Sequence, residues 1–120
     1  MYRPLLVILG ALLNISSVFG LCATVPDDGI MVIPKTVESI PDAAFYKCTK
    51  LKELKVESGS ALVSIGKVAF AHCTSLATLN LPSSLETVGS GAFYNCTELR
   101  SVILPDTVKY IPDISFAHCT

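Results

Sequence analysis

Apolar residues recur along the chain in two short patterns, each repeated about every 23 residues. The first pattern is apolar-x-x-apolar-x-apolar. Because its last two apolar positions are separated by one residue, this end has the period of two that is typical of a β-strand. The pattern therefore predicts a short strand in each of three repeats. Its copies are Leu51, Leu54, Val56; Leu76, Leu79, Leu81; and Leu99, Val102, Leu104.

The second pattern is apolar-x-x-apolar-x-x-x-small-Phe, and it precedes each strand pattern. This spacing fits the 3.6-residue period of a helix as well as it fits a bent, extended chain. The segment before each phenylalanine is therefore expected to be either a second short strand or a turn of helix. The four copies end at Phe45, Phe70, Phe93 and Phe116.

Each of these phenylalanines is followed three residues later by a cysteine, and each cysteine is followed by threonine. The phenylalanines are 25, 23 and 23 residues apart, and the longer first interval contains a loop insertion around Gly59. One unit of this size cannot bury its own apolar side, whereas stacked units form one continuous core. The sequence therefore predicts a repeat solenoid of about three and a half turns, with parallel strands.

Two glycines constrain the backbone of the repeat. Gly66 and Gly89 occupy the position that other repeats give to Pro41 and Pro112. Proline holds φ near about −65°. We therefore expect both glycines to have negative φ and to be present because a side chain would not fit.

The first 23 residues differ from the rest of the chain. Arg3 is followed by an apolar run from Leu5 to Leu13 and then by small residues, which predicts a secretory signal peptide over residues 1–23. Cleavage after Gly20 and cleavage after Ala23 both fit. An uncleaved membrane anchor is the alternative, because the uncharged stretch has the length of about 20 residues that spans a bilayer.

Residues 24–32 then form a lead-in segment, and residues 33–120 form the repeat domain. Hydrophobic residues make up 51% of the chain and charged residues 16%, so the composition is not that of a disordered chain. The formal net charge of −1 provides no basic cluster for nucleic acid or for an anionic membrane surface. Nucleic acid is not expected as a partner, and a membrane is expected only if the N-terminal segment stays uncleaved.

The segment from Leu81 to Gly89, which runs on to Ala92, Phe93 and Cys96, resembles the BspA-like leucine-rich repeats, as does the segment from Ile33 to Phe45. The resemblance covers residues 33–120. It implies a solenoid that is secreted or displayed at the cell surface and that binds host, matrix or cell-surface proteins. It implies no enzyme activity, no catalytic residues and no cofactor.

The cysteine column admits three interpretations. Zinc needs ligands that converge as a tetrahedron, but sulfurs placed one per turn lie in a line, so no metal site is expected. Disulfides between successive turns have a suitable Cα spacing, although parallel side chains rarely reach the required torsion. We expect a column of buried free thiols at Cys48, Cys73, Cys96 and Cys119.

Two histidines precede cysteines, at His72-Cys73 and His118-Cys119. A Cys–His nucleophile requires hydrogen-bond contact between the two side chains, and adjacent residues tend to point apart. The equivalent positions in the other repeats are lysine and asparagine, so we expect a solvated column and no catalytic site. Asn95-Cys96-Thr97 fits the N-glycosylation sequon at Asn95.

The strand positions that point away from the core form the candidate protein-binding face. They stack into a small patch of mixed charge with one apolar member, and such a patch predicts a module for protein interaction or adhesion. The face consists of Lys52, Glu53, Lys55, Thr78, Asn80, Arg100, Ser101 and Ile103.

The alternative function depends on the last repeat, which lacks a strand after Cys119. An apolar end without a polar cap favours association. The chain is then a self-assembling repeat unit that stacks through its C-terminal end, or the N-terminal fragment of a longer repeat protein.

Overall fold

The computed structural model describes Cys22 and residues 25–119. The predicted signal peptide lies outside the described residues, except for Cys22. In the part of the chain that the structure describes, no helix is long and apolar enough to cross a membrane.

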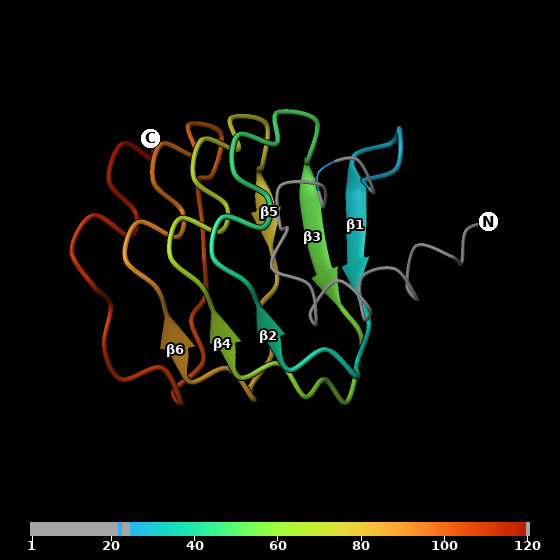
Figure 1. Ribbon diagram of the computed structural model, residues 1–120, viewed down its shortest axis with the longest axis vertical. Coiled ribbons are helices and arrows are strands. Elements are labelled where there is room, and N and C mark those ends of the chain that lie inside the picture. Colours follow the sequence, from blue (N-terminus) through green and yellow to red (C-terminus); the bar gives the residue numbers. More distant parts are fainter. Residues whose placement is uncertain (1–21, 23–24, 120) are drawn as a thin grey trace.

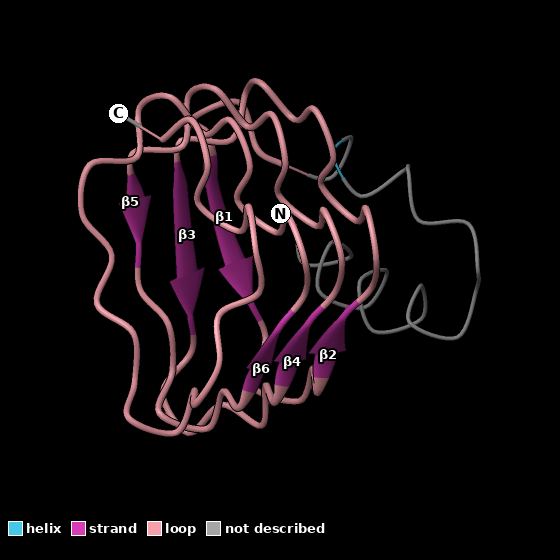
Figure 2. Cartoon of the chain, turned by 90° about the vertical axis from the view of Figure 1, so that its left-hand side faces the viewer, coloured by secondary structure: helices cyan, strands magenta, loops and turns pink. Residues whose placement is uncertain are grey.

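The chain winds into a solenoid with one parallel sheet on each of two sides (Figure 1). Each of the first three levels of the solenoid contains a strand of sheet A, a loop, a strand of sheet B and a corner that carries the phenylalanine (Figure 2). This arrangement confirms the predicted fold. It also shows that the segment before Phe45, Phe70 and Phe93 contains a short strand and not a helix, whereas the segment before Phe116 contains neither. Sheet A consists of β1 (Ile30–Ile33), β3 (Glu53–Val56) and β5 (Thr78–Leu79), and sheet B of β2 (Ser39–Ile40), β4 (Ser64–Ile65) and β6 (Thr87–Val88).

The first strand, β1, begins within the segment that the sequence treats as a lead-in. Met31 pairs with Leu54 and Ile33 pairs with Val56, so β1 has the same register as the later strands. Met31 and Ile33 are fully buried. The described array therefore has four levels, with corners at the four phenylalanines, and it starts before Ile33.

The third predicted strand, around Val102 and Leu104, is reduced to a single bridge between Asn80 and Ile103. The prediction of a full strand there is wrong. The fourth level has a neighbour on one side only within the described residues, and Val102 and Leu104 are only half-buried. Apolar burial is therefore weaker here than in β3, where it holds the strand in register.

The core between the sheets is built from stacked identical side chains. Successive phenylalanine rings lie 5.2, 5.3 and 5.2 Å apart between centroids, with planes no more than 10° from parallel. Phe45, Phe70 and Phe93 are fully buried, and Phe116 is half-buried. Leucines and isoleucines of the two strand patterns fill the space on either side of the rings.

Backbone hydrogen bonds join the corners of successive levels in one direction. The N–H groups of Ala43, Phe45 and Lys47 donate to carbonyls of the second level at 2.9, 2.7 and 2.8 Å. The second and third levels repeat the bonds made by the phenylalanine and by the residue two positions after it. The positions two residues before and two residues after the phenylalanine adopt positive φ in all four levels: Ala43, Val68, Gly91 and Ile114 before it, and Lys47, His72, Asn95 and His118 after it.

Neither Gly66 nor Gly89 has a positive φ, which confirms the expectation from the aligned prolines. A Cβ atom at Gly66 would lie 2.5 Å from the backbone nitrogen of Asp42. A Cβ atom at Gly89 would lie 2.5 Å from the carbonyl carbon of Gly66. Both glycines are therefore required for space between levels and not for backbone freedom.

Candidate functional site

The structure brings the predicted binding residues together on the outward face of sheet A. Leu54 and Leu79 point into the core, so the flanking positions Glu53 and Thr78 point outward and pair across the strands. Asn80 pairs with Ile103 of the fourth level. The other exposed members of the face lie beside these pairs: Lys52, Lys55, Arg100 and Ser101.

A hollow of about 450 Å³ lies on this face between the third and fourth levels. It is found where strand pairing is reduced to the Asn80–Ile103 bridge. Ile103 is 82% exposed, more than any other large apolar residue of the described chain. The hollow combines this apolar side chain with the amide of Asn80 and the hydroxyls of Thr78 and Ser101. Such a surface can bury a partner's apolar side chain while it satisfies nearby polar groups.

The charges on the face are arranged unevenly. Arg100 forms an ion pair with Glu98 at 3.5 Å, and both side chains are well exposed. Exposed pairs of this kind contribute only about 0–1 kcal/mol, so this pair adds little to the stability of the fold. Among the described residues, Lys52 and Lys55 make no ion pair. Their ammonium groups therefore remain available to an acidic partner.

Two members of the face were not predicted. Ile30 pairs with Glu53 and Val32 pairs with Lys55, so β1 extends the face by one strand. Val32 is 36% exposed. The sequence feature that could have predicted this strand is the alternation of Met31 and Ile33, which pair with the inward positions Leu54 and Val56 of β3.

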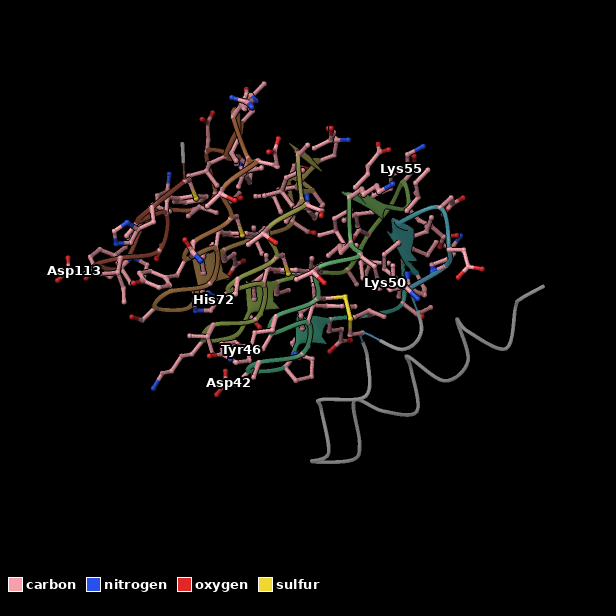
Figure 3. The ribbon with its side chains drawn as sticks, turned by 90° about the horizontal axis from the view of Figure 1, so that it is seen from above. Asp42, Tyr46, Lys50, Lys55, His72 and Asp113 are labelled. Carbon is pink, nitrogen blue, oxygen red and sulfur yellow. A yellow bond between two sulfur atoms is a disulfide. The ribbon has the colours of Figure 1, made fainter. Side chains whose placement is uncertain are left out.

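The cysteine column is not uniform. Cys48 forms a disulfide with Cys22, with a Cα–Cα distance of 5.4 Å (Figure 3). The expectation of a free thiol at Cys48 is therefore wrong. The expectation considered only the four repeat cysteines and did not include Cys22 as a partner for Cys48. Cys73, Cys96 and Cys119 are free, as expected.

The free thiols are held in a protonated state. The Sγ–H groups of Cys73 and Cys96 donate to the carbonyls of Phe45 and Phe70, each at 3.1 Å. Burial raises the pKa of each of these two thiols to about 12. Burial also raises the pKa of Cys119. Because the thiolate is the nucleophile and the metal ligand, this column is unsuited to either role. In the described part of the chain, no three His, Cys, Asp or Glu side chains gather as a metal site.

The histidines belong to a ladder of aromatic rings along the corner of the solenoid. The ring of His72 packs edge-on against Tyr46, with centroids 5.6 Å apart (Figure 3). On its other side it packs edge-on against Tyr94, with centroids 5.4 Å apart. The ring of Tyr94 packs in the same way on His118 at 5.3 Å. The expectation of a solvated column is therefore wrong for His72, which is half-buried. Ala71 stands at the tyrosine position of this level, so the aromatic ring of the level comes from His72.

Asn95 lies beside this ladder. Its side-chain nitrogen is 3.0 Å from Nδ1 of His72, and the residue is half-buried. This nitrogen is the atom to which an N-linked glycan would be attached. Glycosylation at Asn95 stays a prediction.

Comparison with known families agrees with the geometry. Residues 27–120 match the family described as "BspA type Leucine rich repeat region", in six copies. The chain belongs to this family of leucine-rich-repeat proteins. No curated protein matches the chain.

Two solved structures show the same architecture in bacterial members. A leucine-rich cell surface protein from Faecalibacterium prausnitzii A2-165 is 35% identical, with a TM-score of 0.69, and the match covers 75% of this chain and 24% of that protein. The leucine-rich-repeat protein of T. pallidum is 25% identical, with a TM-score of 0.59, and the match covers 78% of this chain and 56% of that protein. The chain therefore spans a quarter to just over half of the length of these structures.

Proposed function

We propose that this BspA-type repeat chain is a secreted or cell-surface module that binds a protein through the outward face of sheet A. The observation that carries the proposal is the hollow between Asn80 and Ile103, where a largely exposed isoleucine lies among polar side chains. Contacts to a host, matrix or cell-surface protein would use this hollow as the apolar centre. The two lysines at Lys52 and Lys55 would form a polar rim. The proposal assigns no catalytic step to the chain.

Two observations support a location outside the cell. One structural relative is described as a cell surface protein. The Cys22–Cys48 bond is of a kind that forms and persists in oxidising compartments and is rare in the cytosol.

The proposal is tested by measuring binding of the purified chain to a panel of purified matrix and cell-surface proteins. Ile103→Asp and Asn80→Arg place a charge and a bulky group in the hollow, so they should weaken binding at least tenfold. Glu86→Arg is the matched control, because Glu86 is exposed beside sheet B on the other side of the solenoid. Binding that is equally strong in all variants, or no binding to any member of the panel, would contradict the proposal.

A second candidate function is self-association through the C-terminal end. In the fourth level the N–H groups of Ile114, Phe116 and His118 have no acceptor within residues 25–119. The corresponding groups of the first level each have one. The half-buried Phe116 and Cys119 line a hollow of about 370 Å³ at this end. A second copy could cover these groups by supplying carbonyl acceptors and apolar side chains.

The molar mass of the chain in solution, measured by light scattering over a hundredfold range of concentration, separates the two candidates. Self-association predicts a mass that rises with concentration and falls back in a Phe116→Asp variant. A monomer at every concentration would leave only the binding module.

A further inference from the structure

Cys22 has the structural position of the repeat cysteine, in an incomplete level that precedes the first. The N–H of Val25 donates to the carbonyl of Cys22 at 3.1 Å. The three complete copies of this turn are closed by the same bond. These bonds run from Leu51 to Cys48 at 3.3 Å, from Leu76 to Cys73 at 3.1 Å and from Leu99 to Cys96 at 3.1 Å. The separation of 26 residues between Cys22 and Cys48 is also close to that of the later cysteines.

The segment that follows Cys22 is packed onto the first complete level. Val25 is 2% exposed and belongs to the core cluster. Gly29 adopts a φ of +80°, and its carbonyl accepts hydrogen bonds from the backbone N–H groups of Lys52 and Glu53. Residues 25–29 therefore cover the N-terminal end of the solenoid, and the disulfide anchors their start to the corner at Cys48.

We infer that the apolar leader is removed by hydrolysis of the peptide bond between Gly20 and Leu21, so that the exported chain begins at Leu21 and keeps Cys22. The inference rests on the proposed export of the chain. Gly20 has a small side chain at the cut, and Val18 lies at the third position back. The competing cut after Ala23 would remove Cys22 and with it the covalent anchor. It would also leave Cys48 as an unpaired thiol at the end of the column.

The two cuts differ in what they leave at the N-terminal end. A chain that begins after Ala23 would retain Val25, but the burial of this side chain would then be opposed by the entropy that a free chain end gains on undocking. A chain that begins at Leu21 has the segment tied at both ends, by Cys22 to Cys48 and by β1 to β3. Terminal repeats need a cap. The cut after Gly20 retains the disulfide that anchors this cap, and the cut after Ala23 removes it.

The test is to express the full chain, Met1 to Thr120, in a host that exports proteins, and to collect it from the medium and the cell surface. N-terminal sequencing and intact mass are measured after alkylation without and with prior reduction. We expect an N-terminus at Leu21, one disulfide, and three cysteines that are alkylated without reduction once the chain is denatured. An exported chain that begins at Thr24, or that is exported uncut, would overturn the inference and leave the proposed location intact.

A matched pair of variants sharpens the result. Gly20→Leu places a bulky residue at the inferred cut and should abolish processing at Leu21. Ala23→Leu changes the competing cut and should leave the N-terminus at Leu21 unchanged. The opposite pattern would overturn the inference. A full-length chain that stays inside the cell would overturn both the inference and the proposed location, and the fractionation distinguishes this outcome from the others.

Discussion

The ring of Phe45 lies over the ring of Phe70, with planes 4° from parallel and centroids 5.2 Å apart. The separation of the centroids indicates an offset stack, which the ring quadrupoles favour over direct overlap. The same relationship continues to Phe93 and Phe116. A central ring thus contacts a ring on each side, whereas Phe116 contacts only one among the described residues.

Loss of a central ring should therefore cost more than loss of the last one. We expect Phe70→Ala to lower the free energy of unfolding by about 3–5 kcal/mol, because it leaves a cavity between two rings. Phe116→Ala should cost clearly less, since Phe116 is half-buried. Urea unfolding followed by circular dichroism measures both. Equal losses in the two variants would show that the stabilisation from a ring does not depend on how many neighbouring rings it contacts.

Ile114 combines a φ of +59° with a β-branched side chain that is 56% exposed. Left-handed backbone is unfavourable for such a residue by roughly 1–2 kcal/mol. Gly91 occupies the equivalent position one level earlier. Ile114→Gly should therefore raise the free energy of unfolding by about 1 kcal/mol, and the reverse change Gly91→Ile should lower it. A destabilised Ile114→Gly variant would mean that side-chain contacts of Ile114 outweigh the backbone strain.

The buried thiols of Cys73 and Cys96 predict a loss of stability in alkali. The pKa of each is raised by burial from 9.0 to about 12 in the folded chain. Between these values the unfolded chain releases protons that the folded chain retains, so stability falls as the pH rises through this range. The slope is at most about 1.4 kcal/mol per pH unit for each thiol.

Below about pH 8 both thiols stay protonated in the folded and the unfolded chain, so their ionisation should add no pH dependence to the free energy of unfolding. Urea unfolding between pH 7 and 10.5 tests this, with the Cys73→Ala, Cys96→Ala double variant as the control. The control is less stable at neutral pH but should decline less steeply above pH 9. Parallel declines would show that other groups account for the alkaline loss.

The Cys22–Cys48 bond closes a loop of 26 residues. By loop entropy such a bond stabilises the folded chain by about 3 kcal/mol. Cys22→Ser should therefore lower the free energy of unfolding of the oxidised protein by roughly this amount. Cys119→Ser should change it little, because Cys119 is half-buried and forms no disulfide. Addition of a reductant should lower the stability of the parent chain to that of Cys22→Ser. No response to the reductant would contradict a stabilising role of the bond.

Sequence periodicity was sufficient to predict the columns of the core, because identical residues at equal spacing stack on one another. It predicted the phenylalanine column and the requirement for space at Gly66 and Gly89. It did not predict β1, because six positions separate Val25 from Met31 where only three separate Leu51 from Leu54. The inserted residues place the first strand out of phase with the others.

The candidate face shows the same division. Outward positions such as Glu53 and Thr78 follow from alternation alone, since the side chains of a strand alternate between its two faces. The hollow beside Ile103 does not follow, because it depends on how far the fourth level departs from strand geometry. The contact of His72 with Tyr46 and Tyr94 does not follow either. The tyrosines come directly after the phenylalanine and His72 comes one residue later, so a comparison of equivalent repeat positions cannot find it.

The ring ladder gives the corner a side-chain period of two levels, although its backbone repeats at every level. Tyrosine levels alternate with histidine levels, through Tyr46, His72, Tyr94 and His118. Insertion or deletion of a single level inside the array would therefore place two levels of the same kind in contact and break the alternation. Internal changes in the length of this array that preserve the ladder come in steps of two levels, so the pair of repeats is the unit in which the interior of this corner can be duplicated.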